Sequence, residues 1–432
     1  MIKKLRTIPL AAIIFLTVSG GPYGLEPLLT YSGQHLTILL LLIVPLLWDV
    51  PTIFVVLELN SMMPVKGGYY YWVKRAFGLR WAFFEGWWTW LYTFVDLAIY
   101  PVLFVQYAAF FFPGLEAYKL PVCLAVIWFS ALLNIRGAVP VGKVSLLLVC
   151  LVLLPFAILF GIVVWQHPLA LPPQHFHGTS FSTVGLAVYT IMWNFLGWDN
   201  TMTYAQDVRR PVWSYISSVA IAFATILTVY MLAMYAAVKT GIPPEMLQEK
   251  GFPAVGMLAG GNWLAALIAA GGMASALGLY SGVLLSVSRI PEVMANDQLL
   301  PQKLNKLHSH YGTPYISIII CSAVVSVMVL LTFESLVIID VTLYGAALFL
   351  EYFSLIQLRK IAPNDVRPFK IRLNKKGLMC MTLFPLTVYV IAVGSAFISD
   401  GKMLKPVLFA IAALLSAELV WQVIKRRLIS QK

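Results

Sequence analysis

Long apolar segments, separated by short polar ones, follow one another along the whole chain. A helix needs about 20 apolar residues to cross a bilayer, and twelve segments approach or exceed this length. The pattern therefore predicts an all-α membrane protein with twelve transmembrane helices. Their expected bounds are 8–33, 36–57, 81–112, 120–135, 144–165, 183–204, 213–238, 263–288, 315–333, 335–358, 378–398 and 405–424.

Two of these spans, the first and the sixth, contain residues that interrupt helices. In the first span, VSGGPYGLEP (18–27) places Gly20, Gly21, Pro22 and Gly24 between apolar segments. Glycine and proline are the two poorest helix formers, so the helix is expected to break there. In the sixth span, IMWNFLGWDNTMTY (191–204) places Gly197 among Asn and Asp residues that favour turns. Both spans are therefore predicted to be discontinuous.

The positions of the two breaks suggest how the chain is organised. They correspond to one another if residues 1–165 (spans 1–5) and 166–360 (spans 6–10) form two inverted repeats, with spans 11 and 12 in residues 361–432. Paired interruptions of this kind mark the binding site of many transporters. Backbone groups freed at membrane depth are tolerated only where they line a cavity, so we expect a ligand site where the two breaks meet.

The half-helices of the first span present opposite ends of their dipoles to the break. A substrate ammonium would meet carbonyl oxygens, whereas an α-carboxylate would meet backbone amides. The alternative is that the glycines only let helices pack closely. The expected carbonyl set is Thr17, Val18 and Ser19 with Asn194 and Phe195, and the expected amide set is Gly20, Gly21 and Gly24.

Composition and charge agree with a membrane protein. Only 11% of the residues are charged, against about 25% in soluble domains. If the N-terminus is cytoplasmic, all but five of the 30 Lys and Arg residues fall in inner loops and tails, as the positive-inside rule requires. The net charge of +12 thus indicates topology and not nucleic-acid binding. We expect an integral plasma (inner) membrane protein with both termini in the cytoplasm.

The charges expected at membrane depth are mostly acidic, and Lys143 is the only basic candidate. Unpaired buried carboxylates are costly unless they bind cations or protons, so this excess predicts a cationic substrate, proton coupling, or both. The alternative is that several acids are interfacial or are bonded to the backbone of the broken helices. The acids are Glu26, Asp49, Glu58, Glu85, Asp96, Asp199, Asp340 and Glu351, and of these Glu26, Asp96 and Asp199 are predicted as substrate-binding residues.

The third span carries two of these acids on one face. At about 100° per residue, Tyr92 and Asp96 each fall within ~20° of Glu85, and Tyr100 lies ~60° from it. Asp96 and Tyr100 are predicted as substrate-binding residues. Glu85 lies nearer the inner end and is either a coupling residue or an interfacial one. By the same arithmetic the tenth span places on one face Asp340, Tyr344 and Glu351.

Several motifs resemble the amino acid–polyamine–organocation permeases. They are GGPYGLE, VDLAIYPVLF, WNFLGWDN and RIPEVMANDQLLPQKLNKLHSHYGTP, together with GGYYYWVKRAFG in a loop (60–78) expected to form an interfacial helix. Within that family the chain is most similar to the branch of plant and protozoan polyamine/amino-acid uptake transporters. The resemblance covers spans 1–10. It implies a LeuT-type 5+5 inverted repeat, with discontinuous helices 1 and 6, that works by alternating access.

The resemblance also implies roles for particular residues. Trp193 matches the aromatic gate over the substrate, although it could equally be an ordinary core or lipid-facing Trp. Some members of the family carry a lysine in the fifth span in place of sodium, and residues 146–156 contain none. Ser275 could contribute to an ion site or only to packing. Asp199 either binds a substrate amine or proton, or caps the following half-helix. The expected coupling residues are thus Glu85, Asp96, Asp199 and Ser275.

Other classes of function find less support in the sequence. The six histidines lie in or near loops, and His175 and His177 are better explained by a solvated loop than by a metal pair. The four cysteines form no CxxC pair, so neither an enzyme nor a metal or cofactor site is predicted. We expect a secondary active transporter of amino acids or polyamines, with cationic substrates favoured and protons as the coupling ion. An exchanger or uniporter of neutral amino acids, and a non-transporting amino-acid sensor of the same fold, remain alternatives.

Overall fold

The computed structural model describes residues 4–166, 180–330, 333–398 and 403–430. These residues are helical almost throughout, and their only extended pairings are two isolated bridges, Leu5 with Val208 and Lys66 with Tyr204. The predicted all-α class is therefore confirmed for the described part of the chain.

Twelve apolar helices follow the predicted spans. Within the described residues, eight are long and apolar enough to cross a membrane, and four are shorter apolar helices. The long ones are α2 (Leu28–Met62), α4 (Leu79–Ala108), α6 (Ala138–Gln166), α8 (Pro211–Lys239), α11 (Asn262–Val287), α14 (Phe333–Ile361), α15 (Lys375–Ile398) and α16 (Leu404–Ser430). The shorter ones are α1 (Thr7–Val18), α5 (Lys119–Ile135), α7 (Phe181–Trp193) and α13 (Tyr315–Met328).

Short helices and turns close the two ends of this bundle. One end holds α3 (Gly68–Phe77), in the loop expected to be helical, and α12 (Arg289–Asn296); we name it the α3 end. The opposite end, the α9 end, holds α9 (Pro244–Lys250) and α10 (Phe252–Gly260). Single 3-10 turns complete the described elements: η1 (Pro113–Tyr118), η2 (Asn200–Thr203), η3 (Ala205–Asp207) and η4 (Gln302–Asn305).

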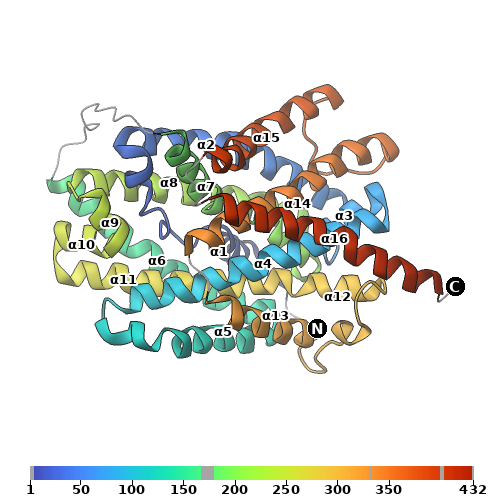
Figure 1. Ribbon diagram of the computed structural model, residues 1–432, viewed down its shortest axis with the longest axis horizontal. Coiled ribbons are helices and arrows are strands. Elements are labelled where there is room, and N and C mark those ends of the chain that lie inside the picture. Colours follow the sequence, from blue (N-terminus) through green and yellow to red (C-terminus); the bar gives the residue numbers. More distant parts are fainter. Residues whose placement is uncertain (1–3, 167–179, 331–332, 399–402, 431–432) are drawn as a thin grey trace.

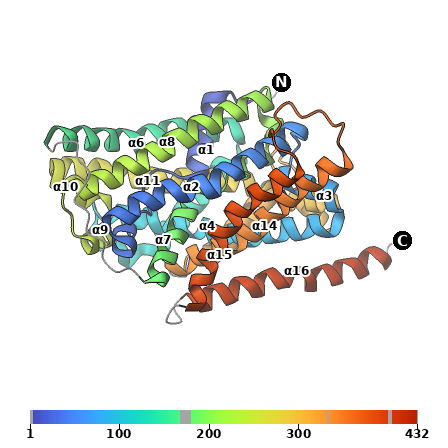
Figure 2. The same ribbon diagram turned by 90° about the horizontal axis from the view of Figure 1, so that it is seen from above.

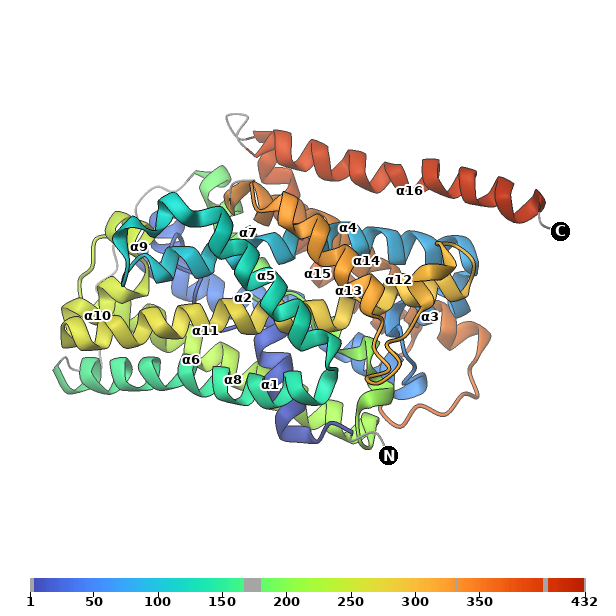
Figure 3. The ribbon, with the colours of Figure 1, turned by 90° about the horizontal axis from the view of Figure 1, so that it is seen from below.

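The long helices run roughly along the longest axis of the molecule, from the α9 end to the α3 end (Figure 1). The C-terminal end of the chain lies at the α3 end (Figure 2). Helix α16 runs along the outside of the bundle (Figure 3), where it packs against α14 and α4. Helix α1, by contrast, is buried from Leu10 to Val18, as expected of a helix that is apolar on all sides.

Both predicted interruptions are present. Helix α1 ends at Val18, and α2 begins only at Leu28. The backbone between them has positive φ at Gly20, Gly21 and Gly24, a conformation that glycine adopts without a steric penalty. A further non-helical residue, Gly33, divides α2 close to the expected boundary between the first two spans.

The sixth span departs from the expected helix after its break. Helix α7 ends at Trp193, and Gly197 has a φ of 96°. The chain then forms the short turns η2 and η3 in place of a regular half-helix, and α8 starts at Pro211. Tertiary bonds hold this segment in place: Thr203 donates to the carbonyl of Ser286 (3.1 Å), and Tyr215 donates to that of Thr201 (2.5 Å).

Candidate substrate-binding site

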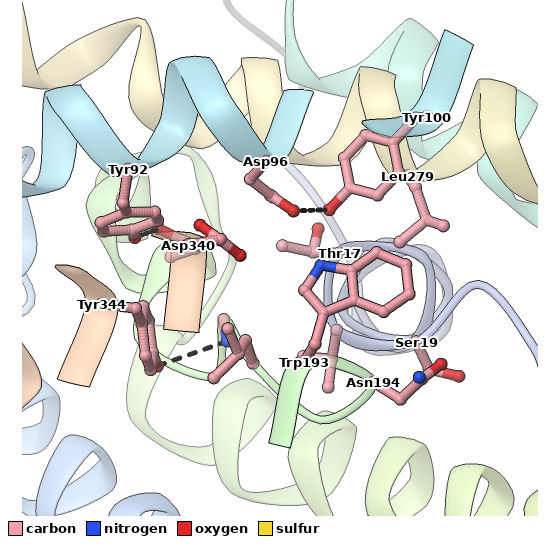
Figure 4. Close-up of a pocket in the computed structure, with 14 residues that line it drawn as sticks. Thr17, Ser19, Tyr92, Asp96, Tyr100, Trp193, Asn194, Leu279, Asp340 and Tyr344 are labelled. Carbon is pink, nitrogen blue, oxygen red and sulfur yellow. Dashed lines mark hydrogen bonds between the residues drawn. The ribbon is translucent and has the colours of Figure 1, made fainter. Parts of the chain in front are cut away.

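A small central cavity lies where the two interruptions meet (Figure 4). Its volume of about 10 Å³ leaves room for about one water-sized sphere, so the site is nearly closed. Four helices and the second interruption supply its walls. The lining residues are Thr17, Val18 and Ser19 at the end of α1, Tyr92, Asp96 and Tyr100 on α4, Leu279 on α11, Asp340 and Tyr344 on α14, and Trp193, Asn194, Leu196, Gly197 and Asn200 at the second interruption.

The end of α1 presents carbonyl oxygens to this cavity because its helical hydrogen bonds stop there. The N–H of Gly21, four residues after Thr17, donates to Ser19 Oγ at 3.0 Å. Residue 22, four after Val18, is a proline and has no N–H to donate. The carbonyls of Thr17 and Val18 thus lose their helical donors, and both residues line the cavity. Such oxygens suit an ammonium group.

Asp96 brings a carboxylate from α4 into the same space. Its Oδ1 accepts a hydrogen bond from Tyr100 Oη at 2.5 Å, and its carboxylate also accepts one from the indole of Trp193. The three side chains face one another across the cavity (Figure 4). All three are predicted from the sequence as substrate-binding residues, and the fold brings them together.

Asp340 supplies a second carboxylate from α14. It is 1% exposed and lines the cavity, where its charge interacts with that of Asp96. Its Oδ1 has no hydrogen-bond partner among the described residues. From the sequence, Asp340 is predicted only to share a helical face with Tyr344, and it is not among the predicted site residues. That shared face was the signal that could have identified it, because both residues line the cavity.

Two more buried acceptor atoms in the cavity lack a partner within the described chain. They are Thr17 Oγ1 and Asn194 Oδ1. None of the lining residues is Lys, Arg or His. Buried polar atoms are usually satisfied, so this set of acceptors without a matching cation is suited to a ligand that donates several hydrogen bonds and carries positive charge.

Trp193 separates the central cavity from a second cavity, which we name the vestibule. The vestibule has a volume of about 240 Å³ and lies toward the α9 end, where Glu26, Tyr107 and Gln248 are among its lining residues. Trp193 lines both cavities. Its ring also stacks on that of Tyr100, with centroids 6.5 Å apart. This position is the one expected of a gate.

The three glycines of the first interruption do not line the central cavity, and each of their amides has a partner within the protein. The N–H of Gly20 donates to the carbonyl of Phe15 at 2.9 Å, and that of Gly21 donates to Ser19. The N–H of Gly24 donates to Oε2 of Glu26 at 2.5 Å. The side chain of Glu26 therefore points at this backbone and not into the central cavity.

Asp199 and Glu85 belong to a separate group, the deep acidic cluster, completed by Glu351 on α14. Asp199 Oδ1 accepts a hydrogen bond from Tyr344 Oη at 2.7 Å, and this hydroxyl accepts one from the N–H of Gly197 at 3.3 Å. Glu85 and Glu351 are buried, and within the described residues no hydrogen bond of 3.5 Å or less reaches their carboxylate oxygens. Both charges interact with that of Asp199, so the three acids lie near one another behind the cavity.

Two other predicted site residues lie beside the cavity without lining it. The ring of Phe195 packs edge-to-face on that of Tyr230, with centroids 5.0 Å apart. Ser275 lies on α11 against Gly20, so close that a Cβ on this glycine would be 2.5 Å from Ser275 Oγ. His175 and His177 fall outside the described residues.

Ion pairs close the molecule at the α3 end. Arg289 is paired with Asp207 at 2.7 Å, Lys74 with Asp297 at 2.7 Å, and Lys66 with Glu292. Tyr70 on α3 also donates to Asp297 at 2.6 Å. Burial, together with this negative neighbour, raises the pKa of Tyr70, so the hydroxyl keeps its proton and the hydrogen bond. The α3 end thus has several charged contacts, whereas the vestibule opens toward the α9 end.

Comparison with known proteins assigns this architecture to a family. The family model described as amino acid permease matches residues 5–417. A probable polyamine transporter of Arabidopsis thaliana is 32% identical over 413 residues, which cover 93% of this chain and 85% of that protein. Polyamine transporter PUT1 of Oryza sativa subsp. japonica is 30% identical over 429 residues, covering 94% and 78% of the two chains.

A more distant relative has a different named activity. The serine/threonine exchanger SteT of Bacillus subtilis is 21% identical over 420 residues, which cover 93% of this chain and 91% of the exchanger. All three relatives are named as transporters or exchangers. The family model spans nearly the whole chain, and eight described helices can cross a membrane. This chain is therefore an integral membrane protein that belongs to the amino acid permease family, within the amino acid–polyamine–organocation superfamily.

Proposed function

We propose that this protein is a secondary active transporter that carries organic cations, polyamines or cationic amino acids, across the plasma membrane by alternating access. The observation that carries the proposal is the pair of carboxylates, Asp96 and Asp340, in a buried cavity with no basic lining residue. A bound ammonium would offset their charge and donate to acceptors that otherwise have no partner. The names of the Arabidopsis and rice relatives support the same class of substrate.

The framework of this proposal is a twelve-helix LeuT-type arrangement. Residues 1–165 and 166–360 would form two inverted repeats, and residues 361–432 would add two peripheral helices. The paired interruptions at 19–27 and 194–199 support this arrangement. The basic residues of the α3 end support its placement in the cytoplasm, with both termini. In alternating access, Trp193 would gate the site on the outer side and the ion pairs of the α3 end would close it on the inner side.

Protons are the proposed coupling ion. The two cavity carboxylates and the deep acidic cluster together place five acids in the membrane interior: Glu85, Asp96, Asp199, Asp340 and Glu351. A carboxylate that releases its cation within a low-dielectric interior carries a large desolvation cost, and binding a proton removes this cost. Exchange of one proton for one ammonium at Asp96 would link the two fluxes.

The substrate class is tested by counterflow in proteoliposomes that contain the purified full chain. Putrescine, spermidine, arginine, serine and threonine are compared, with and without an outward proton gradient, because protons that leave in exchange for the cation would drive it inward. We expect the cations to exchange and the proton gradient to drive their accumulation. Movement of serine and threonine alone would favour a neutral amino-acid exchanger. Saturable binding without any flux would favour a sensor of the same fold.

The two carboxylates are tested by the variants Asp96→Asn and Asp340→Asn. Each is expected to lower the initial rate of putrescine uptake by about tenfold or more, since a hydrogen bond to a charged group contributes about 1.5–3 kcal/mol. Yield of folded protein and melting temperature are measured alongside. Glu245→Gln, an exposed carboxylate on α9, serves as the matched control. Unchanged uptake in both Asp variants would remove the cavity from the transport site.

A further inference from the structure

The first interruption carries a carboxylate of its own. Glu26 is 5% exposed, and its Oε2 accepts the Gly24 N–H at 2.5 Å. Its Oε1 accepts a hydrogen bond from Tyr107 Oη on α4, and the backbone amide of Phe252, where α10 begins, interacts with the same carboxylate. Groups from three separate elements thus surround this one side chain, as donors would surround a bound anion.

The amides of the other two glycines are also engaged. The Gly21 N–H donates to Ser19 Oγ, and this oxygen also accepts a hydrogen bond from Tyr230 Oη at 2.7 Å. The Gly20 N–H continues the helical pattern toward Phe15. The broken helix therefore has no spare amide among Gly20, Gly21 and Gly24 with which to hold the carboxylate of a ligand.

Three tyrosine hydroxyls of the central cavity are committed as donors as well. Tyr100 donates to Asp96, Tyr344 donates to Asp199, and Tyr92 donates to Asn200 Oδ1 at 3.0 Å. An α-carboxylate placed in this cavity would lie beside two acids and would find these hydroxyls already bonded. Burial of an unpaired charge under such conditions costs several kcal/mol, whereas an ammonium meets acceptors on all sides.

We propose that the side chain of Glu26 fills the place of a substrate α-carboxylate, so that the site accepts amines without a carboxylate and rejects the amino acids from which they derive. This inference rests on the proposed transport of cations and narrows it to one chemical class. Glu26 acts on specificity from the vestibule side of Trp193 and makes no contact with the ammonium that Asp96 and Asp340 bind.

The first test uses pairs of competitors that differ only in the α-carboxylate. Proteoliposomes with the full chain take up labelled putrescine while agmatine or arginine, and cadaverine or lysine, compete from outside. The expected result is a half-inhibitory concentration at least tenfold lower for agmatine and for cadaverine than for their amino-acid partners. Equal competition within each pair would overturn the inference and leave cation transport intact. Absence of any cation flux would overturn both proposals.

The second test changes the residue itself. In Glu26→Ala the amide of Gly24 and the hydroxyl of Tyr107 lose their acceptor and become available to an α-carboxylate. We expect the arginine-to-agmatine ratio of half-inhibitory concentrations to fall at least fivefold, and acetate at millimolar concentration to restore it. Glu245→Ala, an exposed acid at the same end of the bundle, should leave the ratio unchanged.

A milder variant covers the case in which Glu26→Ala fails to fold. Tyr107→Phe removes one donor to Glu26 but keeps the aromatic ring, which packs on that of Tyr23 with centroids 4.8 Å apart. In this variant the arginine-to-agmatine ratio of half-inhibitory concentrations is expected to fall at least threefold, with little change in melting temperature. A ratio that stays at the native value in every folded variant would show that Glu26 has only a structural role and would overturn the inference.

Discussion

Two glycines, Gly24 in the first interruption and Gly33 within α2, both have positive φ but differ in what surrounds them. Gly24 has a φ of +100°, and a Cβ built on it would lie 2.5 Å from the Trp193 ring. Gly33 has a φ of +66°, and a Cβ there would meet nothing within 4 Å. Both positions favour glycine for its freedom at positive φ. Only at Gly24 does the missing side chain also make room for the proposed gate.

This difference predicts different outcomes for two alanine variants. Gly24→Ala and Gly33→Ala should each lose about 1 kcal/mol of stability to backbone strain. Gly24→Ala should in addition displace Trp193 and lower the rate of putrescine uptake by about tenfold or more. Gly33→Ala should transport at close to the native rate. Melting temperature and uptake are measured on the same preparations, and equal loss of uptake in both variants would contradict the role of the Trp193 contact.

The sequence was informative about residues wherever the chemistry is local. The glycines and proline of 18–27 determine where α1 ends, and the helical period places Asp96 and Tyr100 on one side of α4. The partner of Glu26 could not be deduced in this way, because Tyr107 lies 81 residues further along the chain. Its hydrogen bond depends on how two helices pack, which no short-range pattern specifies.

At the scale of elements, the length of the apolar segments predicted where the apolar helices lie. The segment after the second break shows that apolar length alone does not predict whether a segment is helical. The sequence predicts that residues 198–204 continue a membrane helix, but in the structure they form turns. Their hydroxyl and carbonyl groups bond to α8 and α11, as in the contact of Thr203 with Ser286. Such tertiary bonds outweigh local helix propensity, which amounts to less than about 1 kcal/mol per residue.

A buried ion-pair group joins elements that are distant in sequence. Glu58 on α2 is fully buried and accepts hydrogen bonds from Arg359 on α14, at 2.8 and 2.5 Å, and from the N–H of Ile371 at 2.8 Å. Arg367 lies 3.5 Å from the same carboxylate. An interfacial position was one explanation for Glu58 from sequence. The structure instead makes it the anchor of the loop that follows α14.

This anchor leads to a prediction about stability. Glu58→Gln leaves two arginines without their counter-charge, and removal of one partner from a buried pair costs about 3–5 kcal/mol. We expect a clear fall in melting temperature, measured by intrinsic fluorescence in detergent. The exposed pair of Arg80 and Glu418 provides the control, because Arg80→Ala at such a site should cost less than about 1 kcal/mol. Comparable losses in the two variants would argue against the anchor.

Over the whole molecule, the two ends of the bundle are closed by different means. Toward the α9 end, one aromatic side chain lies between the central cavity and the vestibule. Toward the α3 end, a backbone hydrogen bond and an ion pair join the start of the chain, the turn η3 and α12. The backbone N–H of Leu5 donates to the carbonyl of Asp207 at 2.8 Å, and the side chain of Asp207 pairs with Arg289. The structure thus has the closed α3 side that alternating access requires of one of its states.

Asp207 therefore offers a means of shifting the balance between the two states. The Arg289 side chain is only 5% exposed, donates to the carbonyl of Leu285 and lies over the ring of Tyr204. Asn has nearly the same shape as Asp, so Asp207→Asn preserves the packing against Arg289. It removes the counter-charge that the guanidinium has only in the closed form. That form should become less stable relative to one in which the α3 end is open and Arg289 is hydrated.

The expected outcome of Asp207→Asn is greater exposure of the central cavity from the α3 side. Leu279, which lines the cavity, is replaced by Cys in a background whose four native cysteines are changed to Ser, and a membrane-impermeant thiol reagent is applied at each face of the membrane. Labelling from the α3 side should become at least threefold faster than in the parent, and labelling from the α9 side should become slower. Arg80→Ala should change neither rate. Faster labelling from both sides would indicate general loosening of the bundle, because a shift between two alternating states requires the two rates to move in opposite directions.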